Sequence, residues 1–467
     1  MTAMLAILLP AFLSAVSPRQ SVVTGRIVNR TSENSNVISV SFNHPLTDNS
    51  TQVGSLSEEG EFAFRGEMIF AQDILLKYEN TSVCLYCTPG DSTHVRIDAS
   101  SNEIAISGDD ARTKDQFRRC MTHIWDVCPL QFPDRELPVG EYLTVLKALV
   151  RQRQDSTDRY VQRMGFDPSV ARRIKLHIAF NGSAHITSYG TAADRLAMYS
   201  DPLFDADNPE NFHSSNFTGI YLPNYILALN GTEIGGSVSI TTSDTGSTPI
   251  ERDTKATANI RRFPVSTVRD FMLYYTLKPY HTAPSRPDES TDSLRSWFSD
   301  PWFADRLLAG QAEDTLFVSR PIEGITFLGS DGASERLPET DLIARIAERH
   351  PEEDTYIAVW ATWCGFCLES LPFTARLKEI FTNKTAIIYI CIDSPEEKWK
   401  TIAAGLPGEH YLLDGDASQL FRSFYRLNGP PSYLMTAPGG RILSNKMVPP
   451  QVIIQLSGRS LDQQTDD

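Results

Sequence analysis

The stretch that decides the fold of the last third of the chain is 356–367, which reads Tyr-Ile-Ala-Val-Trp-Ala-Thr-Trp-Cys-Gly-Phe-Cys. The apolar run over 356–361 is typical of a strand that is buried on both faces. It leads directly into a C-x-x-C pair, Cys364 and Cys367, at the start of a helix predicted over 364–380. A cysteine pair at such a strand-helix junction indicates a thiol redox site.

The position of the two cysteines predicts their roles. Free N–H groups and the positive end of the helix dipole favour the thiolate form of Cys364, and the thiolate is the attacking species. Cys364 is therefore the predicted nucleophile. Cys367 lies one helical turn further on, within disulfide reach, and is the predicted resolving thiol that attacks the mixed disulfide and releases the substrate.

Two other interpretations of the pair remain, half of a zinc site and a pair of inert thiols. A zinc site needs a second pair of Cys or His ligands at comparable spacing, and none follows Cys367. The other C-x-x-C, formed by Cys84 and Cys87, falls in a strand-rich region far upstream. The sequence therefore favours redox chemistry and predicts no metal.

Several motifs carry a resemblance to a known family. They are Val-Trp-Ala-Thr-Trp-Cys-Gly-Phe-Cys at 359–367, Pro372, Tyr-Arg-Leu-Asn-Gly-Pro-Pro-Ser-Tyr-Leu-Met at 425–435, and Gly-Gly-Arg-Ile at 439–442. Here the sequence resembles the TlpA-like thioredoxin family of thiol:disulfide oxidoreductases. The resemblance implies a thioredoxin fold over 319–462, and larger bacterial members carry a β-sandwich and a helical region before it.

The same resemblance implies a substrate-docking turn that faces the disulfide. On this alignment Pro431 is the family's cis-proline, whose turn docks the substrate chain as an added strand. Pro430 departs from the family pattern because it lacks the N–H group that would bond to the bound peptide. We expect Trp363, Pro430 and Pro431 to contact the substrate, Trp363 to shield the disulfide, and docking to be weaker or differently registered than in relatives.

Other departures concern the tuning of the pair. Ser370 stands where relatives often carry Glu, and Glu369 is displaced by one residue, a helical rotation of about 100°, so Glu369 should be solvated. Ala358 stands where thioredoxin has a buried aspartate, so no internal base is expected. Gly365 and Phe366 offer the thiolate no cation or strong donor, which favours a reductant over an oxidant.

The pattern of apolar and polar residues divides the rest of the chain into regions. Apolar and polar residues alternate in short runs from about 22 to 107, Asp109 and Asp110 can cap a helix over 111–128, and strands and helices alternate after 322. Further helices are expected at 141–164, after Asp167, at 220–229, at 265–277 and at 293–308, with a loop over 231–258. The predicted organisation is multidomain: 1–17 a signal peptide, 20–108 a β-sandwich, 109–318 a mainly α-helical domain, 319–462 an α/β thioredoxin-like domain, and 463–467 a disordered tail.

The α/β region is expected to alternate strictly. Strands are predicted at 325–328, 356–361 and 386–392, helices at 341–348, 364–380 and 395–404, and a closing hairpin at 433–436 and 441–443 before a last helix. Such alternation predicts a sheet that is covered by helices on both faces.

The first residues suggest export. The apolar core over 4–16 is too short to span a bilayer but long enough for a secretory signal. A lipid anchor is not expected, because no cysteine lies near Ser17. A buried N-terminal strand or helix is the alternative. The expected location is exported, soluble, and periplasmic or in the cell envelope. A net charge of -15 with pI near 5.1 argues against a nucleic-acid partner.

The remaining cysteines are expected to be unpaired. Cys84 and Cys87 are an odd number apart in a strand, so their side chains point to opposite faces. Cys120 and Cys128 would lie about 12 Å apart along a helix, beyond disulfide geometry. Cys391 lies in an apolar strand and is expected to be a core residue.

The predicted function is reduction of disulfides in envelope proteins through Cys364 and Cys367. No cofactor is expected beyond that redox-active disulfide. The predicted partners are disulfide-containing proteins and, as the family implies, a membrane thiol reductant that supplies electrons. The alternative is an envelope protein that binds a partner or ligand and uses the thioredoxin domain for docking, because the long upstream part of the chain has no recognisable catalytic constellation.

Overall fold

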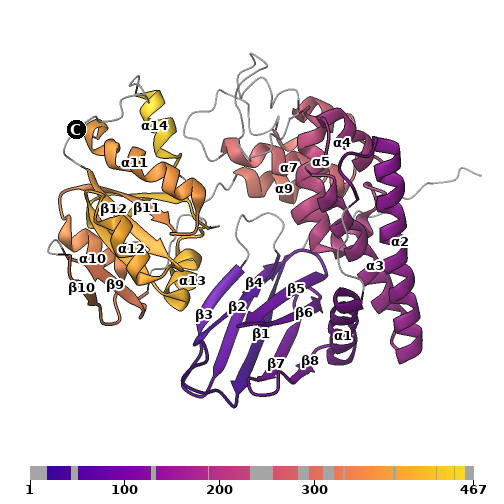
Figure 1. Cartoon of the computed structure of the whole chain (residues 1–467). Coiled ribbons are helices and arrows are strands. Elements are labelled where there is room, and N and C mark those ends of the chain that lie inside the picture. Colours follow the sequence, from indigo (N-terminus) through magenta and orange to yellow (C-terminus); the bar gives the residue numbers. More distant parts are fainter. Residues whose placement is uncertain are drawn as a thin grey trace, which may run out of the picture. The chain divides into compact units, whose positions relative to one another are not determined.

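The computed structural model describes residues 18–43, 51–127, 133–187, 189–231, 256–281, 294–308, 320–329, 332–381, 385–427, 429–445 and 447–457. The chain forms two compact units (Figure 1). The first comprises Met1–Arg30, Val40–Ser50 and Ala63–Ala312, and the second Thr31–Ser39, Thr51–Phe62 and Glu313–Asp467. The predicted signal peptide, the predicted tail, Cys128 and most of the predicted loop over 231–258 lie outside the described residues. No helix of the described residues is long and apolar enough to cross a membrane.

The strand-rich region predicted over 20–108 is present as two four-stranded sheets, of order β4-β1-β7-β8 and β3-β2-β5-β6. Side chains alternate between buried and exposed along β4, as the period of a strand requires. Gly66 allows the ring of Phe42 to lie against the backbone of β4, because a Cβ atom there would be 2.3 Å from ring carbons. The strands are β1 (Arg19–Val28), β2 (Val37–Ser41), β3 (Thr51–Ser55), β4 (Glu61–Met68), β5 (Gln72–Tyr78), β6 (Thr81–Cys87), β7 (Ser92–Asp98) and β8 (Ile104–Gly108).

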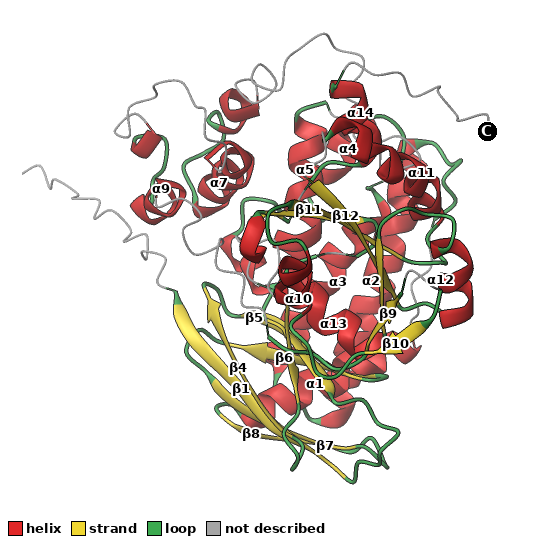
Figure 2. Ribbon diagram, turned by 90° about the vertical axis from the view of Figure 1, so that its left-hand side faces the viewer, coloured by secondary structure: helices red, strands yellow, loops and turns green. Residues whose placement is uncertain are grey.

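Helices follow, as predicted (Figure 2). Their buried side chains form a core that is rich in aromatic residues. Asp167 caps α3 by accepting a hydrogen bond from the Ser169 N–H at 2.8 Å, as expected of an Asp-Pro pair. The elements are α1 (Ala111–Val127), α2 (Val139–Met164), α3 (Pro168–Gly182), η1 (Ser183–His185), α4 (Ala192–Tyr199), η2 (Pro209–His213), η3 (Phe217–Tyr221), α5 (Leu222–Leu229), α7 (Thr267–His281) and α9 (Pro301–Leu308).

The helical segment predicted over 293–308 is confirmed at 301–308, but it is not one continuous helix. Helix α9 begins only at Pro301, and residues 296–300 form a turn and bend before it. Proline lacks an N–H group and disfavours a helical conformation in the residue before it, so it starts this helix rather than continuing one. The buried Asp270 carboxylate holds the turn by accepting hydrogen bonds from the Ser299 N–H, the Ser299 hydroxyl and the Asp300 N–H.

The second unit contains a seven-stranded sheet of order β10-β9-β13-β12-β11-β14-β15. Strands β11, β12 and β13 are parallel, and β9, β14 and β15 pair antiparallel to their neighbours. The elements are β9 (Ile325–Leu328), β10 (Ser334–Arg336), α10 (Leu342–Arg349), β11 (Asp354–Trp360), α11 (Gly365–Ile380), β12 (Thr385–Ile392), α12 (Glu396–Ala403), β13 (Glu409–Leu413), α13 (Gly415–Phe424), β14 (Ser432–Thr436), η4 (Pro438–Gly440), β15 (Ile442–Ser444) and α14 (Pro450–Leu456).

Helices cover this sheet on both faces, as predicted. Helices α11 and α14 lie together on one side, and α10 and α13 lie on the other (Figures 1 and 2). Strands β11 and β12 are buried almost throughout, which is typical of parallel strands inside an α/β layer. With the cysteine pair directly after β11 and a cis-proline directly before β14, this arrangement is a thioredoxin fold.

The predicted strands and helices of this unit are present, and the last helix, which was expected without stated bounds, is α14. Strands β10 and β13 and helix α13 were not assigned from the sequence. Strand β13 has only five residues, and it lies in the sheet between β12 and β9, with which it pairs. Helix α13 is capped by Asp414, whose carboxylate accepts a hydrogen bond from the Ala417 N–H at 3.0 Å.

Candidate active site

Cys364 occupies the N-cap position of α11, as the sequence predicts. Its backbone is extended, and its Sγ accepts a hydrogen bond from the backbone N–H of Cys367 at 3.2 Å. The two residues are joined by a disulfide with their Cα atoms 5.2 Å apart. The N–H group that would stabilise a Cys364 thiolate therefore already points at its sulfur.

The two cysteines differ in access to solvent. Cys364 is 7% exposed and Cys367 is 1% exposed, so the first is the sulfur that another molecule can reach more easily. Large apolar side chains stand in solvent on both sides of it, with Trp363 62% exposed and Phe366 64% exposed. The pair thus lies at an apolar surface that a polypeptide substrate could contact.

The end of strand β12 supports the residues before the pair. The Trp363 indole N–H donates to the carbonyl of Asp393 at 3.0 Å, and the Thr362 N–H donates to the Ser394 hydroxyl at 2.9 Å. Sequence reasoning missed Asp393 and Ser394. The available signal was their position directly after a buried parallel strand, at the sheet edge where functional residues of α/β proteins gather.

The predicted docking turn is present, and the Pro430-Pro431 peptide bond is cis. Ser432 pairs with Val359 of β11, so the turn before it lies at the same end of the sheet as Cys364. Pro431 is exposed and Pro430 is half-buried, and the Ser432 hydroxyl donates to the carbonyl of Gly429. Because both residues are prolines, this turn offers a peptide carbonyl groups but no N–H donor.

The residues expected to tune the pair lie as their sequence suggests. Gly365 has open space where a Cβ atom would stand, and Phe366 is mostly exposed, so neither places a charged group beside the sulfur. Glu369 is exposed and Ala358 is 2% exposed. In the described part of the chain, no carboxylate is hydrogen-bonded to either cysteine.

Ser370 has a hydrogen-bond partner, Gln451, that sequence reasoning missed. The Ser370 hydroxyl, buried one helical turn after Cys367, donates to the Phe366 carbonyl at 2.9 Å and accepts from Nε2 of Gln451 at 2.9 Å. Burial raises the pKa of Tyr433, and the Ser370 hydroxyl opposes that rise. The residue that replaces the family's glutamate is therefore part of a neutral hydrogen-bonded cluster.

The other described cysteines are free, as expected. Cys391 is fully buried beside β11, where it pairs in register with Trp360, and burial raises its pKa to about 12. Burial likewise raises the pKa of Cys87 and of Cys120 to about 12. Cys84 is half-buried, unpaired, and has a strongly raised pKa for the same reason. Among the described residues no group of His, Cys, Asp and Glu could hold a metal ion.

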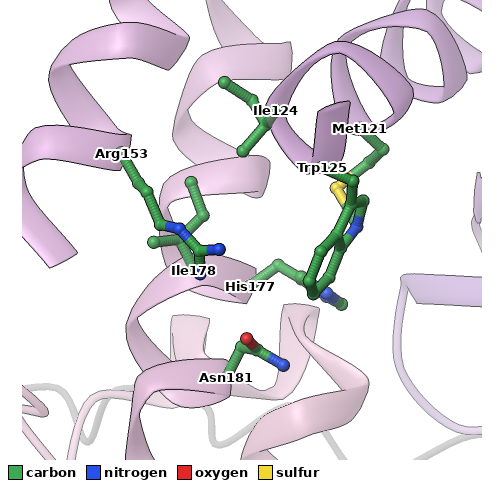
Figure 3. A pocket seen from close by; sticks show the side chains of 7 residues that line it. All are labelled: Met121, Ile124, Trp125, Arg153, His177, Ile178 and Asn181. Atoms are coloured by element: carbon green, nitrogen blue, oxygen red, sulfur yellow. The ribbon is translucent and has the colours of Figure 1, made fainter. Parts of the chain in front are cut away.

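The first unit contains a small hollow between α1, α2 and α3 (Figure 3). The Arg153 guanidinium lies 5.6 Å from the centre of the Trp125 ring, and the buried Oδ1 of Asn181 has no hydrogen-bond partner among the described residues. No nucleophile with an adjacent base lines it. The lining residues are Met121, Ile124, Trp125, Arg153, His177, Ile178 and Asn181.

Comparison with known proteins gives similarities to solved structures only. No family model and no curated protein matches the chain. The thioredoxin domain of a thiol-disulfide oxidoreductase from Bacteroides vulgatus is 18% identical over 31% of this chain and 97% of that one, with a TM-score of 0.24. A thiol:disulfide interchange protein from a Bacteroides species is 17% identical over 32% and 95%, with a TM-score of 0.24. An exposed lipoprotein thioredoxin from Streptococcus pneumoniae is 19% identical over 28% and 96%, with a TM-score of 0.22.

Proposed function

We propose that the protein is a thiol:disulfide oxidoreductase that works through Cys364 and Cys367. The observation that carries the proposal is the disulfide at the N-cap of α11, with the Cys367 N–H directed at the Cys364 sulfur. A helix N-terminus favours a thiolate, and a thiolate is what thiol-disulfide exchange requires. The exposed Trp363 and Phe366 beside the pair support a polypeptide as substrate.

The proposed reaction begins with the reduced protein. The Cys364 thiolate attacks one sulfur of a client disulfide, forms a mixed disulfide, and releases the first client sulfur as a thiolate. Cys367 then loses its proton and attacks the Cys364 sulfur, which releases the second client thiolate and closes the disulfide. The client gains two electrons, and a dithiol donor restores the reduced pair.

The cellular setting is also part of the proposal. The predicted secretory signal supports action in the cell envelope, where client proteins carry disulfides and a membrane thiol reductant would supply electrons. The absence of a cation at Gly365 and Phe366 supports work as a reductant rather than an oxidant. The resemblance of 319–462 to TlpA-like thioredoxins supports the same reaction class.

Reduction of insulin by dithiothreitol tests the activity. We expect the wild-type protein to accelerate it and the Cys364→Ser variant to give the uncatalysed rate. Equal rates for the two proteins would instead favour the docking interpretation, in which the thioredoxin unit binds without exchanging electrons. The Cys367→Ser variant should accumulate stable mixed disulfides through Cys364, and their partners identify the clients.

A further inference from the structure

Helix α14 brings a polar side chain to the buried side of the cysteine pair. Both views show α14 packed beside α11, the helix that carries the two cysteines (Figures 1 and 2). Gln451, in the first turn of α14, donates from Nε2 to the Ser370 hydroxyl at 2.9 Å. That hydroxyl is committed to the Phe366 carbonyl at 2.9 Å, so the orientation of the Gln451 amide is fixed by its contact with α11.

The other end of the same amide is unsatisfied. Oε1 of Gln451 is buried and has no hydrogen-bond partner among the described residues. A buried acceptor without a donor is unfavourable, and native proteins seldom keep one without a reason. A donor that exists in only one redox state would explain it.

Cys367 is such a donor. In the oxidised protein its sulfur carries no hydrogen, whereas reduction gives it an S–H group. Cys367 and Ser370 are three residues apart on α11 and both are buried, so their Cβ atoms are about 5–6 Å apart on one helix face. The Gln451 amide is bonded to Ser370, which follows Cys367 by one helical turn on α11.

We propose that Gln451 is a redox-tuning residue whose Oε1 accepts a hydrogen bond from the Cys367 thiol in the reduced protein only. The inference rests on the proposed function, because it concerns the same dithiol. Reduction by a dithiol donor breaks the disulfide and adds two electrons. The two donor thiols become a disulfide and give up two protons. Cys364 leaves as a thiolate, Cys367 takes up one of the protons and the other passes to solvent, and the proton on Cys367 lies between its sulfur and Oε1 of Gln451.

The proposal has a direct thermodynamic consequence. An interaction made only in the reduced state stabilises that state and raises the reduction potential of the pair. A purely structural role of Gln451 would stabilise both states alike and leave the potential unchanged. The potential therefore separates the two roles.

The experiment measures the equilibrium of the full chain with reduced and oxidised dithiothreitol for the wild type and for Gln451→Met, which keeps the length of the side chain and removes the amide. We expect the equilibrium constant for reduction to fall about tenfold, which lowers the potential by about 30 mV for a two-electron couple. Gln455→Met, at an exposed position of the same helix, is the matched control and should not change it.

Gln451→Asn keeps an amide but withdraws it by one methylene, and it should lower the equilibrium constant as Gln451→Met does. The proposal is overturned if a folded Gln451→Met or Gln451→Asn variant has an equilibrium constant for reduction within twofold of the wild-type value. The measurement does not use insulin: a shifted potential without insulin reduction would refute the proposed enzyme and keep the role of Gln451, and the reverse result would refute only that role.

Discussion

After reduction of the disulfide, Cys364 should be far more reactive than Cys87, Cys120 and Cys391. Cys364 lies at a helix N-terminus with an N–H group on its sulfur, which favours the thiolate. Cys87, Cys120 and Cys391 are buried among apolar side chains, which raises the pKa of each thiol to about 12. A thiol becomes reactive only as the pH rises through its pKa, so these three should stay inert near neutral pH.

The size of the difference follows from the fraction of thiolate. At about pH 8 a thiol with a pKa of about 12 is ionised to roughly one part in ten thousand, whereas an ordinary cysteine with a pKa of about 8.5 is ionised to roughly one quarter. The higher intrinsic nucleophilicity of the more basic thiolate recovers a factor of about 40. Cys364 should therefore react about 60-fold faster or more, since burial also blocks access of the reagent to the other three.

The assay alkylates the reduced native protein with iodoacetamide at about pH 8 and follows each cysteine peptide by mass spectrometry over time. Unfolded, reduced protein is the control, and there all cysteines should react at similar rates. If Cys87, Cys120 or Cys391 reacts within tenfold of Cys364 in the native protein, the reasoning from burial and helix position is refuted. Cys367 should remain slow even in the Cys364→Ser variant, because its side chain is 1% exposed.

Two further predictions concern tuning and stability. Phe366→His should raise the reduction potential by about 30 mV or more, because an imidazolium beside the helix start stabilises the Cys364 thiolate, and equilibration with glutathione should give a larger rise at about pH 6 than at about pH 8. Asp73→Asn should destabilise the first unit by about 2 kcal/mol in urea unfolding at neutral pH. Burial acts to raise the pKa of Asp73, but His177 and the hydrogen bonds from Ser215 outweigh burial and lower that pKa. The stabilisation by the Asp73 carboxylate is therefore complete above about pH 4 and is lost as the pH falls. The free energy of unfolding of the variant should accordingly depend less on pH in this acid range.

The sequence predicted the α/β unit well because its signals are local. An apolar run and a C-x-x-C pair each act within about a dozen residues, and the structure contains the expected strand β11 and helix α11. The cis bond before Pro431, which the family resemblance implied, is also present. The helical segment predicted over 293–308 is interrupted before Pro301, because a proline disfavours a helical conformation in the residue before it. Strand β13 was not assigned, since its place in the sheet depends on β12 and β9.

The sequence by itself predicted the proposed reaction class, because the roles proposed for Cys364 and Cys367 follow from their spacing and from their position at a predicted helix start. Only the tertiary structure decided what surrounds the sulfurs. Trp363 is held by the carbonyl of Asp393, and Ser370 is bonded to Gln451, 81 residues further along the chain. Such contacts join separate elements of one fold, and no periodicity or motif in a single segment encodes which side chain of a distant helix will bond to Ser370.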